Sequence, residues 1–260
     1  MDLRFPLSLR VLLAATLALC GLSCASAAVR ESVEKLTVED SSERALFVVD
    51  DAQPVAQVLL VFPGGDGSLG LGDSPPAVSP GAGFIGALRK YFVRPGTAIV
   101  LMDSPTAHRS MPVEYRETPE HRAWLAALVA RMRERFPKAR LIGVGYSNGA
   151  VSALIAGREP GVSGVVLLAG IFRRYADLGA FGVEVPMLVV HHEVDRCVPP
   201  DFDEPFRRVL KPTMVRNVAQ QYGSELCGPV SAHQFYGQET TVAAVVLEWL
   251  DTGRAPLRAR

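Results

Sequence analysis

Cysteine is scarce in this chain, and neither sign of charge is in surplus. The 260 residues include 4 cysteines, with no paired CxxC and no HExxH pattern of the kind that binds zinc. The 27 basic and 27 acidic residues balance, which argues against general electrostatic binding to nucleic acid or anionic membranes. No repeat with a period of about 20–50 residues is visible, which argues against a solenoid. The chain is instead rich in apolar residues, at 48%, enough for the core of one large domain or two small ones.

Long hydrophobic runs are also lacking, except near the N-terminus. Val11 to Leu22 is apolar, follows Arg4 and Arg10, and precedes the small residues Ala25-Ser26-Ala27. These are the parts of a secretory signal peptide, and the run is short for a membrane span. We therefore predict a signal peptide over residues 1–27 and a mature domain over 28–260. The mature protein is expected in the periplasm or secreted, with no transmembrane segment; Cys24 fits a lipoprotein site loosely, so a lipid-anchored form is the alternative.

Two cysteines, Cys197 and Cys227, remain in the predicted mature chain. An even pair in an exported protein indicates a disulfide. It would close a loop of about 30 residues and contribute roughly 3–4 kcal/mol in the chain-entropy model. The alternative is two separate buried thiols.

Apolar runs alternate with helical patterns along the mature chain. This alternation predicts a single α/β domain whose mostly parallel central sheet is flanked by helices. The gap between residues 169 and 186 is too short for an inserted cap domain, so the loop over 63–83 is expected to shape an open site. The predicted strands are 45–49, 57–62, 97–102, 140–144, 162–169, 186–190 and 213–219, and the predicted helices are 84–92, 118–136, 150–156, 205–210 and 240–250.

The segment Gly145-Tyr146-Ser147-Asn148-Gly149 is the most informative part of the sequence. It lies between a predicted strand and a predicted helix, as in a nucleophile elbow. Such a turn strains the serine backbone, and a side chain at either flanking glycine would collide with a neighbouring element. Ser147 is therefore the candidate nucleophile; the alternative is an ordinary glycine-rich turn.

A serine nucleophile needs a base and a residue that orients the base, and in elbow enzymes the acid and then the histidine follow the serine. Asp195 comes just after a predicted strand, where open α/β sheets place functional groups. It is the favoured acid. Glu193 is the alternative acid. A further interpretation is that Asp195 is an ordinary solvated loop residue without a catalytic role.

The favoured base is His233, which lies in a loop just before the terminal helix. His191 and His192 are adjacent on a strand and so point to opposite faces, which does not suit shared metal binding. We expect them either to support the site residues from behind or to be packing residues, rather than to form a metal pair. His108 and His121 precede the elbow and are expected at the surface.

The oxyanion hole requires backbone amides aimed at a developing negative oxygen. The amide of Asn148 is one candidate, because it directly follows the serine. The second is expected from Pro63-Gly64-Gly65-Asp66-Gly67, with Gly65 as first choice and Asp66 as second. The rival interpretation of this loop, a phosphate cradle, lacks the lysine of a P-loop.

The predicted disulfide has a place in this arrangement. Cys197 lies two residues after the candidate acid, and Cys227 lies six residues before the candidate base. A bridge between them would tie together the two loops that must hold Asp195 and His233.

These residues resemble the α/β-hydrolase superfamily over about Gln57 to Leu250. The resemblance depends on the loop at 63–67, the elbow at Ser147, and Asp195 and His233. More narrowly, the segments 191–197 and 227–233 resemble exported bacterial α/β hydrolases of unassigned substrate. The resemblance implies serine-mediated acyl transfer to water and no cofactor. Pro63 stands where many esterases have histidine, which leaves the second oxyanion donor open.

Together these features predict an exported serine hydrolase that acts on small or medium carboxylic esters. No nucleic-acid partner or metal is expected. An acyltransferase or peptidase of the same fold, and an inactive hydrolase-like binding protein, are the alternatives. Phe84, Tyr146 and Phe235 are expected either to line the substrate pocket or to belong to the core.

Overall fold

A computed structural model gives the arrangement of the chain. It describes residues 29–38, 41–75, 83–105, 108, 110–171, 182–200, 210–216 and 220–259. The predicted signal peptide lies outside the described residues, and so does the predicted helix 205–210 apart from Leu210.

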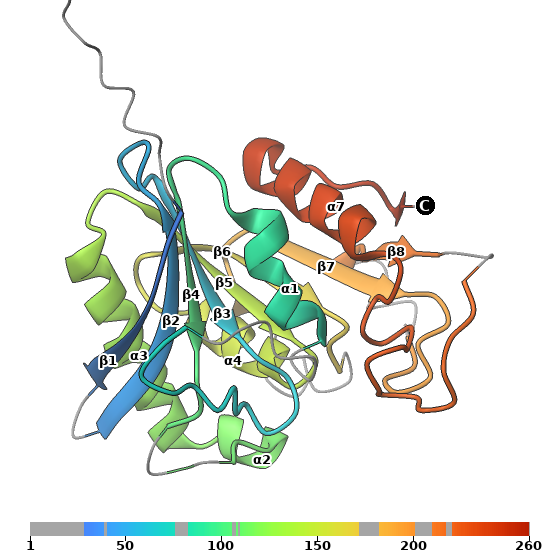
Figure 1. Cartoon of the computed structure of the whole chain (residues 1–260), viewed down its shortest axis with the longest axis horizontal. Coiled ribbons are helices and arrows are strands. Elements are labelled where there is room, and N and C mark those ends of the chain that lie inside the picture. The colour runs from blue at the N-terminus through green and yellow to red at the C-terminus, as the bar shows by residue number, and fades with distance from the viewer. Residues whose placement is uncertain are drawn as a thin grey trace, which may run out of the picture.

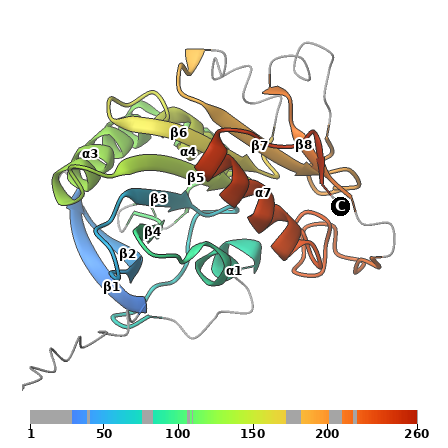
Figure 2. The ribbon, with the colours of Figure 1, turned by 90° about the horizontal axis from the view of Figure 1, so that it is seen from above.

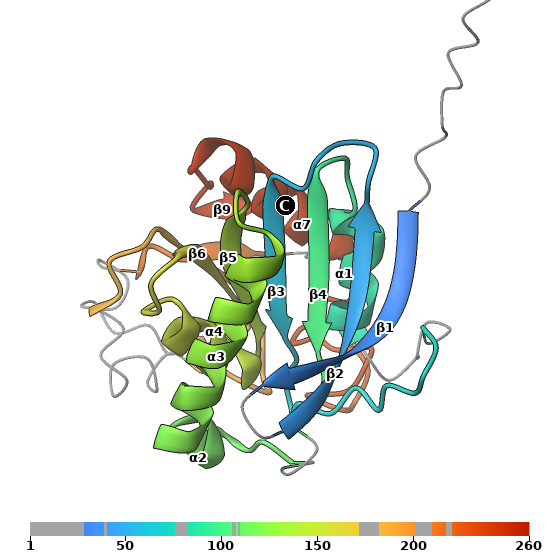
Figure 3. The same cartoon turned by 90° about the vertical axis from the view of Figure 1, so that its left-hand side faces the viewer.

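The described strands form one nine-stranded sheet in the order β1-β2-β4-β3-β5-β6-β7-β8-β9 (Figure 1). β1 pairs with β2 and β2 with β4 in antiparallel fashion, and all the other pairs are parallel. Figure 3 shows β1 and β2 at the antiparallel edge beside β4. The strands are β1 (Val29–Val38), β2 (Ser41–Asp50), β3 (Gln57–Phe62), β4 (Thr97–Met102), β5 (Arg140–Tyr146), β6 (Val162–Leu168), β7 (Met187–His192), β8 (Thr213–Val215) and β9 (Arg258–Ala259).

Helices cover both faces of the sheet (Figure 2). β3 is apolar along most of its length and buried throughout, as expected of a parallel strand with helices on both sides. Successive residues of β3 enter two different cores, so Leu60 packs with the α3 and α4 side and Leu59 packs with the α1 and α7 side. The helices among the described residues are α1 (Gly83–Phe92), α2 (Val113–Arg116), α3 (Pro119–Arg135), α4 (Gly149–Ala156) and α7 (Glu239–Thr252).

The predicted α/β architecture is confirmed, and β3 and β4 have the predicted bounds. The sequence analysis did not predict β1, β9 or α2. β1 (VRESVEKLTV) carries mostly charged and polar side chains that stay exposed or half-buried, so it lacks the apolar density of a buried strand. α2 has 4 residues and β9 has 2, which is too short for a periodic pattern.

No cap domain is evident in the described part of the chain, in agreement with the short connection between β6 and β7. Among the described residues, no helix combines the length and hydropathy needed to span a bilayer. The carboxyl ends of the parallel strands β3, β5 and β7 lie at the same edge of the sheet, and the loops that follow them therefore meet there.

Candidate active site

Ser147 occupies a sharp turn between β5 and α4. Its backbone φ is 51°, a left-handed value that is unusual for a residue other than glycine. A Cβ on Gly145 would stand 2.4 Å from Ala150 Cα, and a Cβ on Gly149 would stand 2.1 Å from the Phe62 carbonyl oxygen. Both flanking positions therefore require glycine, and the elbow geometry expected from the sequence is present.

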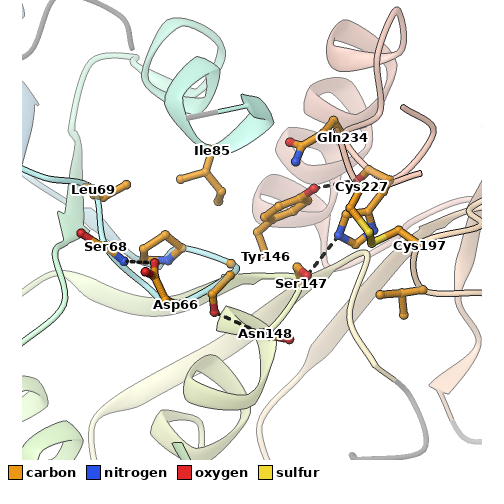
Figure 4. Close-up of a pocket in the computed structure, with 15 residues that line it drawn as sticks. Asp66, Ser68, Leu69, Ile85, Tyr146, Ser147, Asn148, Cys197, Cys227 and Gln234 are labelled. Carbon is orange, nitrogen blue, oxygen red and sulfur yellow. Dashed lines mark hydrogen bonds between the residues drawn. A yellow bond between two sulfur atoms is a disulfide. The ribbon is translucent and has the colours of Figure 1, made fainter. Parts of the chain in front are cut away.

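His233 connects Ser147 to Asp195. The Ser147 hydroxyl lies 3.0 Å from His233 Nε2, and His233 Nδ1 lies 2.8 Å from Asp195 Oδ2. With the neutral ring protonated at Nδ1, the ring donates to the carboxylate and accepts from the serine. All three residues are buried. The structure thus brings together the three side chains that the sequence singled out, and Figure 4 shows the contact at Ser147.

The Asp195 carboxylate is fixed by its own loop. Oδ1 accepts from the amides of Cys197 and Val198 at 2.9 and 3.0 Å, which leaves Oδ2 for His233. The alternative acid, Glu193, instead faces Arg216 and Arg258 at 3.5 and 3.8 Å. Asp195 is therefore the carboxylate adjacent to the histidine.

His191 and His192 have structural partners. His191 Nε2 donates to the Val198 carbonyl at 2.8 Å, and burial lowers the pKa of His191 to about 4, so its ring is neutral. His192 Nδ1 accepts from the Val194 amide, and its Nε2 lies 2.7 Å from the Tyr222 hydroxyl. Within the described ranges, no cluster of three His, Cys, Asp or Glu side chains is arranged to hold a metal ion.

Cys197 and Cys227 form a disulfide with a Cα–Cα distance of 5.0 Å. The predicted pairing is confirmed, and two separate thiols are excluded. The bridge joins the loop that carries Asp195 to the segment that leads to His233. Both cysteines also line the pocket at Ser147.

The loop over residues 63–67, here called the oxyanion loop, lies against the elbow. A Cβ on Gly64 would be 2.9 Å from Ser147 Cβ. Gly67 N donates to Gly64 O at 2.9 Å, and Gly65 has a φ of 56°, the pattern of a turn with glycine at its second position. Within the described part of the chain, the amides of Gly65, Asp66 and Asn148 donate to no backbone carbonyl. Both candidates for the second donor remain consistent with this geometry.

A pocket of about 450 Å³ opens over Ser147 (Figure 4). The loop after β3 lines one side of it, as expected, and the disulfide lines another. Tyr146 also lines it, and the Tyr146 hydroxyl donates to the His233 carbonyl at 3.0 Å. Phe84 and Phe235 belong instead to the core, where their ring centroids lie 5.3 Å apart.

A buried polar cluster next to the oxyanion loop was not anticipated from the sequence. Arg116 Nη1 donates to Ser152 Oγ at 2.7 Å, and His121 Nε2 lies 2.9 Å from the same oxygen. All three residues are fully buried, so the expectation of a surface His121 is wrong. His121 stacks on Trp124, and burial together with Arg116 lowers its pKa to about 3. Its helical spacing from Trp124 and Leu128, which share the buried face of α3, could have revealed its position.

Ser152 and Ser147 have different surroundings. The Ser152 hydroxyl is shared by Arg116 and His121, whereas the Ser147 hydroxyl contacts His233 and lines the pocket. Ser147 is therefore the serine that a substrate can reach.

Comparisons with known proteins support the fold. No family model and no curated protein matches the chain. Among solved structures, a dienelactone hydrolase from Anabaena variabilis has a TM-score of 0.59 and 16% identity, covering 86% of this chain and 97% of its own. An α/β serine hydrolase without a lid from Xanthomonas campestris has a TM-score of 0.59 and 16% identity, covering 87% and 97%. An esterase from Pyrobaculum calidifontis has a TM-score of 0.57 and 13% identity, covering 85% of each chain. The chain therefore has the α/β-hydrolase fold.

Proposed function

We propose that the protein is a serine hydrolase that cleaves carboxylic esters through an acyl-enzyme intermediate. The observation that carries the proposal is the continuous hydrogen-bonded path from Ser147 through His233 to Asp195. This path occurs at an elbow whose serine lines a pocket. A serine, a base and a residue that orients the base are the groups needed to activate a hydroxyl at neutral pH.

In the proposed reaction, Ser147 Oγ attacks the ester carbonyl while His233 Nε2 takes its proton. The tetrahedral oxyanion is bound by the amide of Asn148 and by that of Gly65 or Asp66. His233 then protonates the leaving alcohol. Water attacks the acyl-enzyme with His233 as the base, which releases the acid and restores the serine. Asp195 holds the ring with Nδ1 protonated and stabilises the imidazolium form.

The pocket supports a small or medium substrate. Its volume of about 450 Å³ lies in the range of small-molecule sites. The names of two structural neighbours, an esterase and a dienelactone hydrolase, agree with an ester or lactone carbonyl as the reacting group. A site without a cap is also consistent with hydrolysis, because water can reach the acyl-enzyme.

The first test is labelling with a fluorophosphonate, with the modified residue located by peptide mass spectrometry. We expect stoichiometric labelling at Ser147 and none in Ser147→Ala. Folded Ser152→Ala should still be labelled at Ser147 in full, although at a lower rate. Hydrolysis of p-nitrophenyl esters should fall by several orders of magnitude in Ser147→Ala. A folded, disulfide-bonded wild-type protein that does not react would instead favour the inactive binding protein.

We also propose that residues 1–27 are a signal peptide and that the mature protein is exported. The N-terminal pattern and the Cys197–Cys227 disulfide support this, because disulfides persist in oxidising compartments. Expression of the whole chain in a bacterial host, followed by fractionation and N-terminal sequencing, tests it. A mature N-terminus at Ala28 is expected. A lipid-modified Cys24 would identify the anchored form, and a full-length cytoplasmic product would contradict export.

A further inference from the structure

Four consecutive carbonyl oxygens of the oxyanion loop, over residues 63–66, each accept a hydrogen bond. The donors, in loop order, are Arg116 Nη2 (3.1 Å), Gly67 N (2.9 Å), Asn148 Nδ2 (3.0 Å) and Met111 N (2.7 Å). In a trans peptide unit the carbonyl and the following N–H point in opposite directions. Fixing these carbonyls therefore fixes the directions of the amides that follow them, including both candidate oxyanion donors in the loop.

Arg116 holds this loop at both ends. Its Nη2 donates to the Pro63 carbonyl directly, and its Nε donates to the Met111 carbonyl at 2.9 Å. Met111 in turn donates its amide to the Asp66 carbonyl. The loop also lies directly on the guanidinium, since a Cβ on Gly67 would be 2.9 Å from Arg116 Nη2.

Arg116 also reaches the elbow helix. Its Nη1 donates to Ser152 Oγ on α4, the helix whose first turn follows Asn148. The planar guanidinium holds its donors in a rigid fork, so the Arg116 side chain sets the spacing between the oxyanion loop and α4. The Asn148 side chain makes a second connection between the start of α4 and the oxyanion loop, because its Nδ2 donates to Gly65 O (Figure 4).

Burying an arginine side chain completely is unfavourable in free energy, and an apolar side chain would fill the same space more favourably. Among the described residues, no carboxylate forms an ion pair with Arg116, whose partners are two carbonyls and a hydroxyl. Burial lowers the pKa of Arg116 to about 10, and the nearby Asp66 charge opposes this shift, so the side chain is charged at neutral pH. Burying a charge that no carboxylate contacts directly is unfavourable compared with burying an apolar side chain. The hydrogen bonds to the oxyanion loop give a reason for keeping it.

We propose that Arg116, together with the side-chain amide of Asn148, positions the oxyanion loop for the transition state. This inference is based on the proposed serine-hydrolase function, which it deepens. Neither side chain touches the reacting atoms. Asn148 Nδ2 fixes the Gly65 carbonyl, which orients the amide of Asp66, and Arg116 anchors the loop that carries both candidate amides.

The experiment compares Arg116→Lys, Arg116→Met and Asn148→Ala with wild type on a p-nitrophenyl ester. We expect kcat to fall by about 10–100-fold with KM changed by less than about 3-fold, because misplaced oxyanion donors act on the transition state. A trifluoromethyl ketone forms a tetrahedral adduct with the serine that carries an oxyanion, so its inhibition constant should rise by the same factor as kcat/KM falls. The inhibition constant of the product alcohol, p-nitrophenol, should be unchanged.

Arg133→Lys is the matched control. Arg133 also donates to a backbone carbonyl, that of Ala139, from a half-buried position, and it is not among the residues that line the pocket. It should leave both inhibition constants unchanged. Asn148→Ala removes a partly exposed side chain and keeps the backbone amide, so it tests the proposal even if the Arg116 variants fail to fold.

Two outcomes overturn the proposal. One is a set of folded variants whose kcat and trifluoromethyl ketone affinity stay within about twofold of wild type. The other is equal weakening of the ketone and the product alcohol, which would show a general distortion of the pocket. If wild type reacts with fluorophosphonate at Ser147, these outcomes affect only this inference. A wild-type protein that does not react overturns the proposed function and this inference together.

Discussion

At the scale of single residues, the site depends on how each polar group is held. Asp195 uses one carboxylate oxygen for two amides of its own loop and the other for His233. A neutral His191 lies beside it, with Nε2 3.4 Å from Oδ2. The carboxylate is therefore surrounded by donors and neutral groups, an arrangement suited to stabilising a positive charge on His233.

The first prediction separates the two candidate acids. Asp195→Asn should lower kcat by about 10⁴-fold, because an amide favours the wrong tautomer of His233. Glu193→Gln should leave kcat unchanged, because Glu193 faces Arg216 and Arg258 rather than the histidine. Steady-state kinetics of the two purified variants provide the measurement. A large loss in Glu193→Gln alone would reverse the assignment.

The second prediction concerns Asp66, whose exposed carboxylate is the acidic group in the described lining of the pocket. A substrate carboxylate about 4 Å away would be disfavoured by about 1 kcal/mol, or roughly fivefold. Asp66→Asn keeps an oxygen that can accept from Ser68 N and removes the charge. It should therefore raise kcat/KM for an anionic ester relative to a neutral one by up to about fivefold, and 1 M salt should abolish the difference.

Asp73→Asn is the control for this effect, because Asp73 is exposed, pairs with Arg44 and does not line the pocket. The selectivity of this variant should equal that of wild type. An unchanged ratio of anionic to neutral ester hydrolysis in Asp66→Asn would show that Asp66 does not influence the choice of substrate.

At the scale of elements, the site is assembled by loops that follow parallel strands. β3 leads to the oxyanion loop, β5 leads to Ser147, and β7 leads to Asp195. His233 comes from the segment before α7, which is joined to the Asp195 loop by the Cys197–Cys227 disulfide. The sheet therefore fixes the oxyanion loop, Ser147 and Asp195, and the disulfide restrains the segment that carries His233.

The third prediction is that the disulfide supports both stability and activity. Its sequence separation of 30 corresponds to roughly 3–4 kcal/mol of stabilisation in the chain-entropy model. The double variant Cys197→Ser/Cys227→Ser should lose about this much in urea unfolding. Its kcat should also fall at temperatures where it is fully folded, because His233 and Asp195 are no longer tied together. Reduced wild-type protein with normal activity and an unchanged melting temperature would contradict this role.

At the scale of the whole molecule, the sequence revealed the parts of the fold that depend on short-range patterns. β3 and β4 could be bounded because both are apolar and buried on both faces. Ser147, Asp195 and His233 could be chosen because elbow chemistry constrains their order along the chain. Arg116 and Ser152 could not be found in this way, because their contacts join segments 36 residues apart without any local motif. β1 was missed because its pairing with β2, rather than its composition, makes it a strand.

The final prediction concerns the stability of the whole protein in acid. Burial lowers the pKa of His121 to about 3 and that of His191 to about 4, both from 6.5. The unfolded chain therefore binds these protons at a higher pH than the folded protein does. The stability due to the neutral buried rings is complete above about pH 6.5 and is lost as the pH falls toward 4. Each pKa unit corresponds to about 1.4 kcal/mol. Between about pH 6.5 and 4, protonation of the two rings should therefore lower the free energy of unfolding by several kcal/mol.

Urea unfolding at a series of pH values measures this effect, and His121→Gln should test it. Glutamine can still form a hydrogen bond to Ser152 but does not titrate, so the variant should lose less stability than wild type between pH 6.5 and 4, even if it is weaker at pH 7. His108→Gln is the control, because His108 is exposed. The free energy of unfolding of this variant should fall between pH 6.5 and 4 by the same amount as that of wild type. Equal slopes for His121→Gln and wild type would mean that His121 does not contribute to the loss of stability in acid, and the buried cluster behind the oxyanion loop would then tolerate a protonated ring.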